Sequence, residues 1–391
     1  MKQPKILFLV VIALLPLIFV SCGLFGGASV SGGWAGTAFR DGIIYAGSRD
    51  GRVVAINSST QSQSWNYTIT PATAIYTTPI VDGDLVYVGT YNGQVLALNT
   101  TARSQDLSFP QKRYGEWEWD CPIENARSNA IVADMVMSED ALYVASSNGR
   151  VYSLNKVTGD ENWNREDIPV LAEKLWTSPV IQGDTLYVGT FDGHIYALSL
   201  ETGELSDWSF ESEAGFASSP VISDGIIYVG SFDRYLYAIE IGGAEPEWRF
   251  PQEKPADNWF WASPVVRGGV VYAGCLDGKF YAINATTGEE TWSYMTRDQE
   301  NKPSPIVSSP VLTGDLLIVT NESGVVYVFD LTVEIGNEAV PLKTISIGAA
   351  VKSSFCAYDG FVYIRGENNS VYVVDIDEGE VSWKVSLTIE E

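Results

Sequence analysis

The stretch from Leu186 to Trp208, LYVGTFDGHIYALSLETGELSDW, holds two apolar strands, two turns and a tryptophan. Apolar residues run or alternate on both sides of Asp192-Gly193, as they do in a half-buried β-hairpin. The Asp-Gly pair supplies the positive φ that a tight hairpin turn needs. Gly203 then begins a second turn, which leads to a further strand with the tryptophan. The stretch therefore predicts three antiparallel strands in succession.

The same pattern returns along the chain, and eight copies can be counted. The strands before the hairpin turn start at Gly42, Asp84, Ala141, Thr185, Gly225, Val270, Leu316 and Phe361. The turn positions are Gly51, Gly93, Gly149, Gly193, Arg234, Gly278, Gly324 and Asn369. Successive turn positions are 41 to 46 residues apart, except for one interval of 56, which is the period of four-stranded propeller blades. The sequence thus predicts an all-β fold, an eight-bladed β-propeller of four-stranded antiparallel blades over residues 34–391.

The first and fourth strands of each unit have their own signatures. The first begins with two small residues and a proline, at Pro79, Pro179, Pro220, Pro264 and Pro310. Small side chains suit a crowded central axis, and proline is tolerated at the edge of a sheet. The fourth carries a tryptophan, at Trp65, Trp163, Trp208, Trp248, Trp292 and Trp383. We expect these indoles to pack between neighbouring sheets, with the N–H bonded to a carbonyl.

The two ends of the propeller leave two ways of closing the ring open. Residues 34–40 resemble an inner strand, and residues 383–389 resemble an outer strand. Either each blade is one contiguous segment, or the first and last blades exchange a strand.

Composition and charge exclude several classes of function. The chain has 391 residues, of which 46% are hydrophobic, which is enough apolar sequence to form a large hydrophobic core. Its formal net charge of −25 repels nucleic acid and anionic lipid surfaces. His194 is the one histidine, so the chain cannot form a metal site with several histidines, and a serine–histidine triad would have to use His194. We therefore expect no nucleic-acid partner and no histidine-based catalysis.

The N-terminal segment is typical of an export signal. Lys2 and Lys5 precede an apolar run over residues 6–20, which is too short to span a membrane comfortably. A positive start, an apolar middle and a small residue before the end are the three parts of a signal peptide. We assign residues 1–21 to this signal peptide and expect the mature protein to be extracytoplasmic.

Cys22 follows a small residue at the end of the apolar run, an arrangement that resembles the lipobox of bacterial lipoproteins. The resemblance implies that Cys22 becomes the lipidated N-terminus, although Phe19 stands where leucine is usual; simple secretion is the alternative. Residues 22–33 are rich in glycine and serine, so we expect the lipidated cysteine to continue into a flexible tether. The propeller would then hang close to a membrane, in the periplasm or at the cell surface.

The units carry a family resemblance. Tyr-Val-Gly, Asp-Gly, Tyr-Ala-Leu, Thr-Gly-Glu and tryptophan, as they stand between Leu186 and Trp208, resemble the quinoprotein (PQQ) repeat. That family contains PQQ-dependent dehydrogenases and also propellers that bind no cofactor. Among the latter, the chain is most similar to the BamB family of outer-membrane-barrel assembly lipoproteins. This resemblance implies a non-catalytic, monomeric scaffold that binds protein partners in the cell envelope.

The enzyme alternative implies PQQ with Ca²⁺ in the propeller. Dehydrogenases of this type typically carry an adjacent pair of cysteines at the cofactor. Here the cysteines are isolated, at Cys22, Cys121, Cys275 and Cys356. With Cys22 lipidated, three remain, and at most one disulfide can form among them. We therefore expect no catalytic residue, no cofactor and no metal, with a PQQ-dependent dehydrogenase-like protein as the alternative function.

The longest connection between blades is a first candidate for partner binding. The segment Ser104–Asn129 accounts for the interval of 56 residues and holds Tyr114, Trp117 and Trp119 among charged residues. Aromatic and charged side chains in one loop suit the hot spot of an interface. The alternative is an insertion that folds back and buries its own aromatics.

A second candidate lies where the inner strands begin. Tyr76, Trp176 and Trp261 each stand three residues before an inner-strand proline, so blade geometry predicts that they surround the mouth of the central channel. Such aromatics stack on a flat ligand or a sugar, or contact an extended peptide. The alternative is that they cap the inner strands and keep water from the core. A surface sensor propeller that binds glycan or peptide is therefore a third function to consider.

Overall fold

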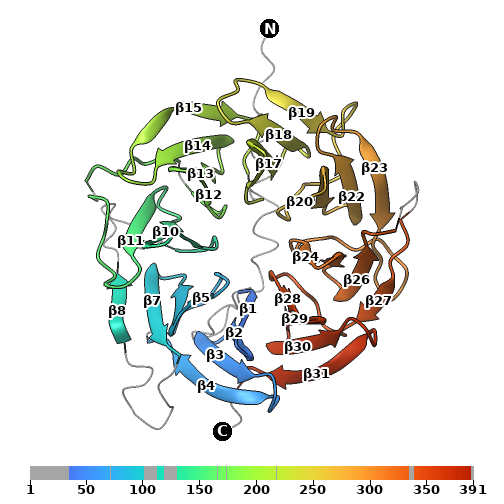
Figure 1. Ribbon diagram of the computed structural model, residues 1–391, viewed down its shortest axis with the longest axis horizontal. Coiled ribbons are helices and arrows are strands. Elements are labelled where there is room, and N and C mark those ends of the chain that lie inside the picture. Colours follow the sequence, from blue (N-terminus) through green and yellow to red (C-terminus); the bar gives the residue numbers. More distant parts are fainter. Residues whose placement is uncertain are drawn as a thin grey trace, which may run out of the picture.

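The computed structural model describes residues 35–70, 72–100, 112–118, 130–164, 166–172, 174–216, 218–333 and 339–388. Over these residues the chain forms 31 strands, which build eight sheets arranged radially around a central axis (Figure 1). This confirms the predicted all-β, eight-bladed propeller. The described part holds no helix that is long and apolar enough to cross a membrane. The expected signal peptide, Cys22 and the tether lie outside the described residues.

The strands of each blade follow one another in chain order from the central axis to the rim. The first blade holds β1 (Thr37–Arg40), β2 (Ile43–Gly47), β3 (Arg52–Asn57) and β4 (Ser62–Thr68). The second holds β5 (Ile80–Asp82), β6 (Leu85–Gly89), β7 (Gln94–Asn99) and β8 (Lys112–Glu118). The third holds β9 (Val136–Met137), β10 (Ala141–Ala145) and β11 (Val151–Asn155). The fourth holds β12 (Val180–Gln182), β13 (Thr185–Gly189), β14 (His194–Ser199) and β15 (Leu205–Glu211).

The second half of the ring repeats this order. The fifth blade holds β16 (Val221–Ser223), β17 (Ile226–Gly230), β18 (Leu236–Glu240) and β19 (Pro246–Phe250). The sixth holds β20 (Val265–Arg267), β21 (Val270–Gly274), β22 (Lys279–Asn284) and β23 (Glu290–Met295). The seventh holds β24 (Val311–Thr313), β25 (Leu316–Thr320), β26 (Val325–Asp330) and β27 (Lys343–Ser346). The eighth holds β28 (Cys356–Tyr358), β29 (Phe361–Gly366), β30 (Ser370–Asp375) and β31 (Glu380–Ser386).

Two blades differ from the expected pattern. In the third blade, the place of the fourth strand is taken by an isolated bridge between Leu154 and Glu161. In the second blade, β8 pairs with β7 as the outer strand, with Trp117 opposite Val95. The prediction of a connecting loop over the whole of Ser104–Asn129 was therefore wrong for residues 112–118. Their alternation of charged and aromatic residues is compatible with a strand, and the blade needs a fourth one.

The eight turn positions read from the sequence all have positive φ. The six glycines range from 78° to 99°, and the two other residues, Arg234 and Asn369, have φ of 72° and 58°. A left-handed conformation favours glycine because a Cβ meets the following carbonyl. The turn therefore keeps this backbone conformation even where the residue is not glycine. Arg234 thus occupies the same place in its unit as the glycines do in the others.

Neighbouring blades are held together by the indoles of the outer strands. Trp163 of the third blade donates its N–H to the carbonyl of Leu200 in the fourth blade, at 3.1 Å. Trp248 of the fifth blade does the same with Ala285 in the sixth, at 2.9 Å. Trp208 of the fourth blade reaches Gly243 in the fifth, at 2.7 Å. These bonds confirm, for three blades, the predicted packing between sheets and the predicted carbonyl partner.

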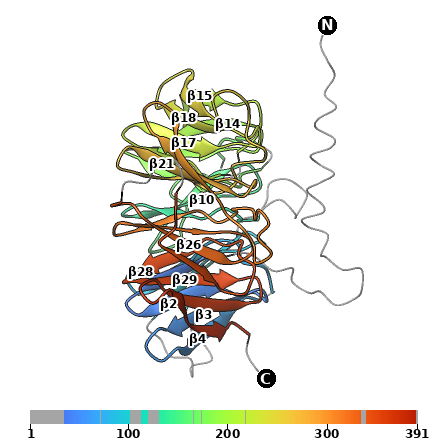
Figure 2. The same ribbon diagram turned by 90° about the vertical axis from the view of Figure 1, so that its right-hand side faces the viewer.

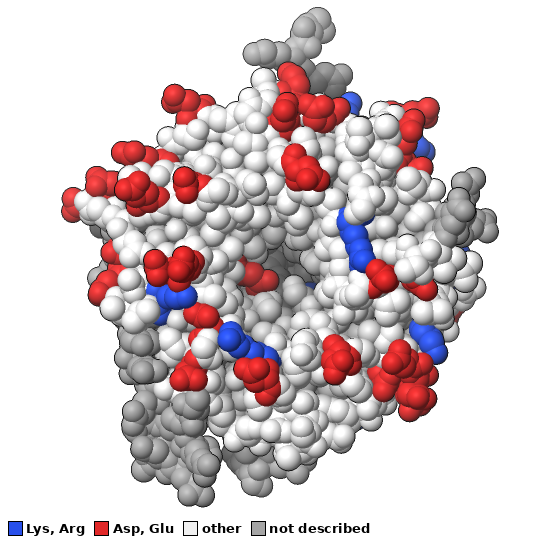
Figure 3. All heavy atoms as spheres, in the orientation of Figure 1, with Lys and Arg blue, Asp and Glu red and all other residues white. Residues whose placement is uncertain are grey.

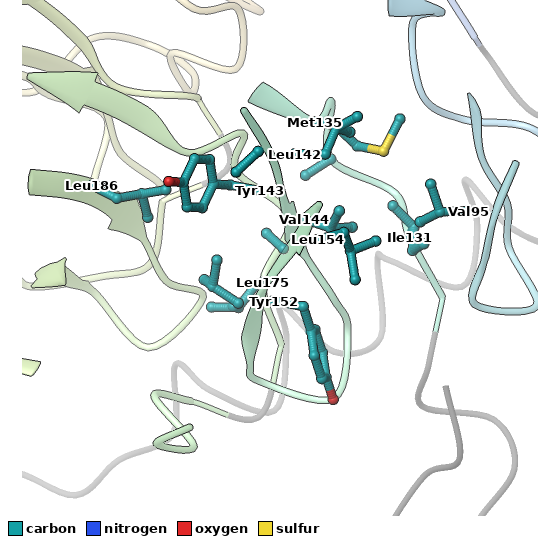
Figure 4. Packing of buried hydrophobic residues seen from close by; sticks show 14 of the residues in the cluster. Val95, Ile131, Met135, Leu142, Tyr143, Val144, Tyr152, Leu154, Leu175 and Leu186 are labelled. Carbon is teal, nitrogen blue, oxygen red and sulfur yellow. The ribbon is translucent and has the colours of Figure 1, made fainter. Parts of the chain in front are cut away.

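The third blade is buried from both sides by its neighbours. Leu142 and Val144 on β10 and Leu154 on β11 are fully buried, in a cluster that also takes in Val95 of the second blade and Leu186 of the fourth (Figure 4). Burying such side chains stabilises the fold by roughly 1.5–3 kcal/mol each. Hydrophobic packing therefore holds this blade in the ring although its outer strand is reduced.

The ring closes between the first and eighth blades without exchange of a strand. The two blades lie side by side in both views of the ribbon (Figures 1 and 2). The Thr37 hydroxyl donates to the carbonyl of Tyr363 at 2.6 Å, and the Phe39 ring stacks on the Tyr363 ring with centroids 4.7 Å apart. Arg52 donates to the carbonyl of Leu387 at 3.1 Å. Of the two ways of closing the ring, the structure therefore has contiguous blades.

A pair of glycine substitutions in the seventh blade tests the turn geometry. A Cβ on Gly324 would lie 1.8 Å from the carbonyl oxygen of Ala349, whereas one on Gly314 would meet nothing within 4 Å. Both glycines have positive φ. We expect Gly314→Ala to lower the free energy of unfolding by about 1 kcal/mol, because alanine is strained at a positive φ even where its Cβ meets no other atom. Gly324→Ala should cost about 3 kcal/mol or more, because backbone must move. Urea denaturation checks this, and equal losses would contradict it.

Candidate functional site

One face of the propeller carries both the connections between blades and the turns between second and third strands. The two kinds of loop are hydrogen-bonded to each other within a blade. Leu171 N donates to Gly149 O at 2.8 Å, and Ala256 N donates to Arg234 O at 3.1 Å. We call this the connection face. Because loops vary most freely in sequence, it is the natural place for a binding surface.

Figure 3 shows the face that is turned toward the viewer in Figure 1. Acidic side chains are spread around its rim, and the centre of the ring is hollowed. Basic side chains are fewer there than acidic ones. This agrees with the formal net charge of −25 and places much of the charge at the periphery.

The connection face carries a continuous row of aromatic rings over the fourth, fifth and sixth blades. Trp176 contacts Phe191 with ring centroids 5.0 Å apart, and Phe191 contacts Phe232 at 5.1 Å. Phe232 in turn contacts Trp259 at 5.0 Å and Trp261 at 5.9 Å. All five side chains are partly exposed. We call these five residues the aromatic row.

The aromatic row contains two of the residues that the sequence analysis selected. Trp176 and Trp261 lie in it, whereas Phe191, Phe232 and Trp259 were not predicted. Phe191 and Phe232 occupy the same place in their units, directly before the Asp of the hairpin turn. Aligning the units on that turn and asking which positions are aromatic would have found both.

Tyr76 has a different environment. Its side chain is 8% exposed and packs against Tyr91, with ring centroids 5.3 Å apart. Tyr91 is 49% exposed and stands directly before the turn of the second blade, as Phe191 does in the fourth. The second blade therefore presents Tyr91 rather than Tyr76 to solvent, and Tyr76 fits the alternative of a capping residue.

The other predicted binding residues lie in or beside β8. Tyr114 and Trp117 belong to this outer strand, away from the channel mouth (Figure 1). Trp119 lies outside the described residues. The strand β8 therefore lies apart from the blades that carry the aromatic row, and the role of these three residues in partner binding stays a prediction.

Below the channel mouth, small residues of the inner strands form hydrogen bonds from blade to blade. Ser178 N donates to the Ser219 hydroxyl at 2.8 Å, Ser219 N to that of Ser263 at 3.0 Å, and Ser263 N to that of Ser309 at 3.0 Å. The bonds all run in the same direction around the axis. They replace the backbone partners that an innermost strand lacks, since it is a sheet edge. The small residues predicted at the axis thus have a bonding role as well as a steric one.

In the third blade this inner position is occupied by Asp134. Thr78 of the second blade donates its N–H to Asp134 Oδ1 at 2.5 Å and its hydroxyl to Oδ2 at 3.1 Å. Desolvation raises the pKa of the Asp134 carboxyl, and the two bonds from Thr78 offset part of this effect. Asp134 therefore continues the bonding pattern of the serines but with a group that is costly to ionise.

A groove lies at the rim between the fifth and sixth blades, beside the aromatic row. It has a volume of about 480 Å³. Its charged lining residues are Glu253, Lys254, Asp257, Asp277, Lys279, Glu289 and Glu290. Five of these are acidic and two are basic, so the groove favours cationic groups. We call it the rim groove.

Outside the aromatic row and the rim groove, the described part of the chain holds few side chains that could act as nucleophiles or metal ligands. Cys275 and Cys356 are free thiols, and burial raises the pKa of both, that of Cys356 to about 11. Such thiols are poor nucleophiles near neutral pH. No group of three or more His, Cys, Asp or Glu side chains among the described residues is placed to hold a metal ion.

The chain is a β-propeller of quinoprotein-type repeats. It forms a closed ring of eight units that share the hairpin turn, and most units carry a tryptophan that packs against the next blade. The family model for the outer membrane protein assembly factor BamB matches residues 25–166, 111–207 and 171–385. These matches cover most of the chain, which therefore belongs to the BamB family. None of the curated proteins compared matches it significantly.

Solved structures share the fold. BamB from Moraxella catarrhalis is 19% identical, with a TM-score of 0.64 over 91% of this chain and 95% of that one. The computationally designed Ika8 protein is 16% identical, with a TM-score of 0.66 over 88% and 98%. A europium-containing methanol dehydrogenase is 11% identical, with a TM-score of 0.62 over 90% and 84%. At these identities the likeness concerns the propeller alone.

Substituting Asp134 tests its part in the pH dependence of stability. Because its pKa is raised in the folded state, the free energy of unfolding falls as pH rises from the ordinary value of 3.8 through the raised one. Asp134→Asn removes that fall and keeps an acceptor for Thr78 N. We expect the variant to match the parent near pH 3 and to exceed it by on the order of 1 kcal/mol at pH 7.

Asp134→Ala is the control, because it leaves Thr78 N–H without its acceptor. It should lower the free energy of unfolding by about 1–3 kcal/mol. Urea denaturation of the three proteins from pH 3 to pH 7 measures both effects. A difference between Asp134→Asn and the parent that does not change with pH would contradict the assignment.

Proposed function

We propose that this protein is a non-catalytic, extracytoplasmic lipoprotein that acts as a protein-binding scaffold in the assembly of outer-membrane proteins. The observation that carries the proposal is the match of the BamB family model to most of the chain. The BamB of Moraxella catarrhalis shares the propeller over 91% of this chain. The surface that would bind partners is the connection face, because it carries exposed aromatic side chains together with charged ones.

The aromatic row supports a binding role over a structural one. Monomeric proteins rarely expose a contiguous apolar patch without a use for it. The five rings of the row are partly exposed although their blades hold well-packed cores of their own. Aromatic residues are also the type most enriched at the centre of interfaces.

The absence of a cofactor is part of the proposal. It is supported by the isolated cysteines of the sequence and by the single histidine, His194. If PQQ with Ca²⁺ added to the purified protein gave a bound-cofactor absorbance and alcohol-dependent dye reduction, the dehydrogenase alternative would replace the scaffold.

The lipid anchor is tested at Cys22. Cys22→Ser should abolish incorporation of radiolabelled palmitate and move the protein from the membrane fraction to the soluble fraction, because the lipid supplies the membrane affinity. Cys356→Ser is the matched control, since it removes a cysteine from the propeller and should leave both readouts unchanged. Membrane fractionation that is the same with and without Cys22 would rule the anchor out.

Partner binding at the connection face is tested by photo-cross-linking in cells. A benzoylphenylalanine in place of Tyr91, which is 49% exposed, should give adducts with outer-membrane assembly components. The control is the same substitution at Tyr358, which is 58% exposed and precedes a first-to-second strand turn on the opposite face. We expect adducts at Tyr91 to be at least about fivefold stronger, because only Tyr91 of the two lies on the connection face. Adducts only with unrelated proteins, or equal adducts at both sites, would contradict the proposal.

A further inference from the structure

The aromatic row and the rim groove are joined by one short segment of chain. Asp257 lines the groove, and Trp259 belongs to the row only two residues later. Two residues span at most about 7 Å, so the acidic groove continues directly from the apolar row. A ligand that covers both must be apolar along most of its length and positively charged at one end.

The way in which the rings pack distinguishes between classes of ligand. Trp176 and Phe191 meet at an interplanar angle of 65°, Phe191 and Phe232 at 64°, and Phe232 and Trp259 at 74°. Successive rings are therefore edge to face and do not form the flat, parallel platform on which a sugar ring or a planar cofactor stacks. Rings at these angles leave notches between them, which suit single apolar side chains.

The length of the row matches an extended polypeptide. Its three successive centroid separations are 5.0, 5.1 and 5.0 Å. Side chains on one face of a strand recur every 7 Å or so, so the row has room for two or three of them. A peptide with apolar residues at alternate positions would place those residues on the row and the others toward solvent.

Charge sets the direction of such a peptide. The loops of the connection face over these three blades carry eight acidic residues that the structure describes: Glu166, Asp167, Asp192, Glu213, Asp233, Glu253, Asp257 and Asp277. The basic ones are Lys174, Arg234 and Lys254. Lys174 stands at the Trp176 end, with its ammonium 5.8 Å from the ring centroid. A cationic end of the peptide is therefore repelled near Trp176 and attracted at the rim groove.

From these observations we infer that the aromatic row and the rim groove together bind an extended polypeptide segment with alternating apolar residues followed by arginine or lysine. This deepens the proposed function, because a scaffold in protein assembly meets polypeptides before they fold. The apolar side chains lie among the rings from Trp176 to Trp259, and the basic residue lies in the groove beside Glu253 and Asp257. Affinity comes mainly from the rings, and the carboxylates fix the direction.

The inference is tested with peptides of defined sequence and the purified full chain. The probe is fluorescein-labelled SFSFSFSRR, and its binding is measured by fluorescence anisotropy. We expect saturable binding that weakens at least tenfold when the phenylalanines are replaced by serine. Replacing the two arginines by glutamate should weaken it about fivefold or more, and so should raising NaCl from 0.05 to 0.5 M.

Variants of the chain locate the site. Phe232→Ser should weaken binding of SFSFSFSRR about tenfold, and Phe232→Leu should restore most of the affinity because it keeps an apolar side chain. The double variant Glu253→Gln with Asp257→Asn should weaken binding only of the peptide with arginines. Both carboxylates are exposed, so this variant keeps the fold. Tyr358→Ser, on the opposite face, is the control and should bind as the parent does. Thermal melting confirms that each variant is folded.

Three outcomes would overturn the inference: no saturable binding of SFSFSFSRR, binding that Phe232→Ser and the double variant leave unchanged, or tighter binding of chitotetraose than of the peptide. The last would identify a glycan site. These outcomes are separable from failure of the proposed function. Cross-links from Tyr91 to assembly components without peptide binding refute the inference alone, and peptide binding without such cross-links refutes the scaffold alone.

Discussion

The contact between a tryptophan of one blade and a glycine of the next is the constraint on which the ring depends. A Cβ on Gly203 would lie 2.7 Å from the indole of Trp163, and one on Gly288 would lie 2.7 Å from that of Trp248. In both pairs the indole N–H bonds to the carbonyl three residues before that glycine. In these two pairs the indole packs directly on the glycine backbone and is hydrogen-bonded to it, which fixes the position of one blade relative to the next.

Because the units have the same turn between second and third strands, one position of the repeat occupies an equivalent place on the connection face in every blade. The residue before the hairpin turn is Arg49, Tyr91, Ser147, Phe191, Phe232, Leu276, Glu322 and Glu367 in the eight units. It is aromatic in the second, fourth and fifth blades, leucine in the sixth, and charged in the seventh, eighth and first. The repeat therefore supplies equivalent sites around the ring, and substitution at this single position makes the fourth to sixth blades apolar and the seventh, eighth and first charged.

Regular features of the repeat were predictable from the sequence, and features that depend on several blades were not. The turn at Arg234 and the role of Trp248 follow from their places in the unit. Phe232 was overlooked because it stands inside the motif that defines the fold, where an aromatic residue looks structural. Its exposure depends on Trp259 and Trp261, which come from the next blade. The strand at residues 112–118 was missed because the interval is long and because Trp117 stands opposite Val95, whereas the signature tryptophan Trp65 stands opposite Ala55, two positions further along the third strand.

The carboxylates beside the aromatic row also bear on what the row does not bind. An exposed apolar row is a liability, because two copies of the chain can bury it against each other. In such a pair the carboxylates of both copies, Asp233 and Asp257 among them, would be brought together. Burial raises the pKa of Asp233 although Tyr237 and the backbone N–H of Tyr235 donate hydrogen bonds to its carboxylate, so covering this charge further would add to its desolvation cost. The same carboxylates attract a basic polypeptide, so they favour a cationic ligand over a second copy and over any anionic surface.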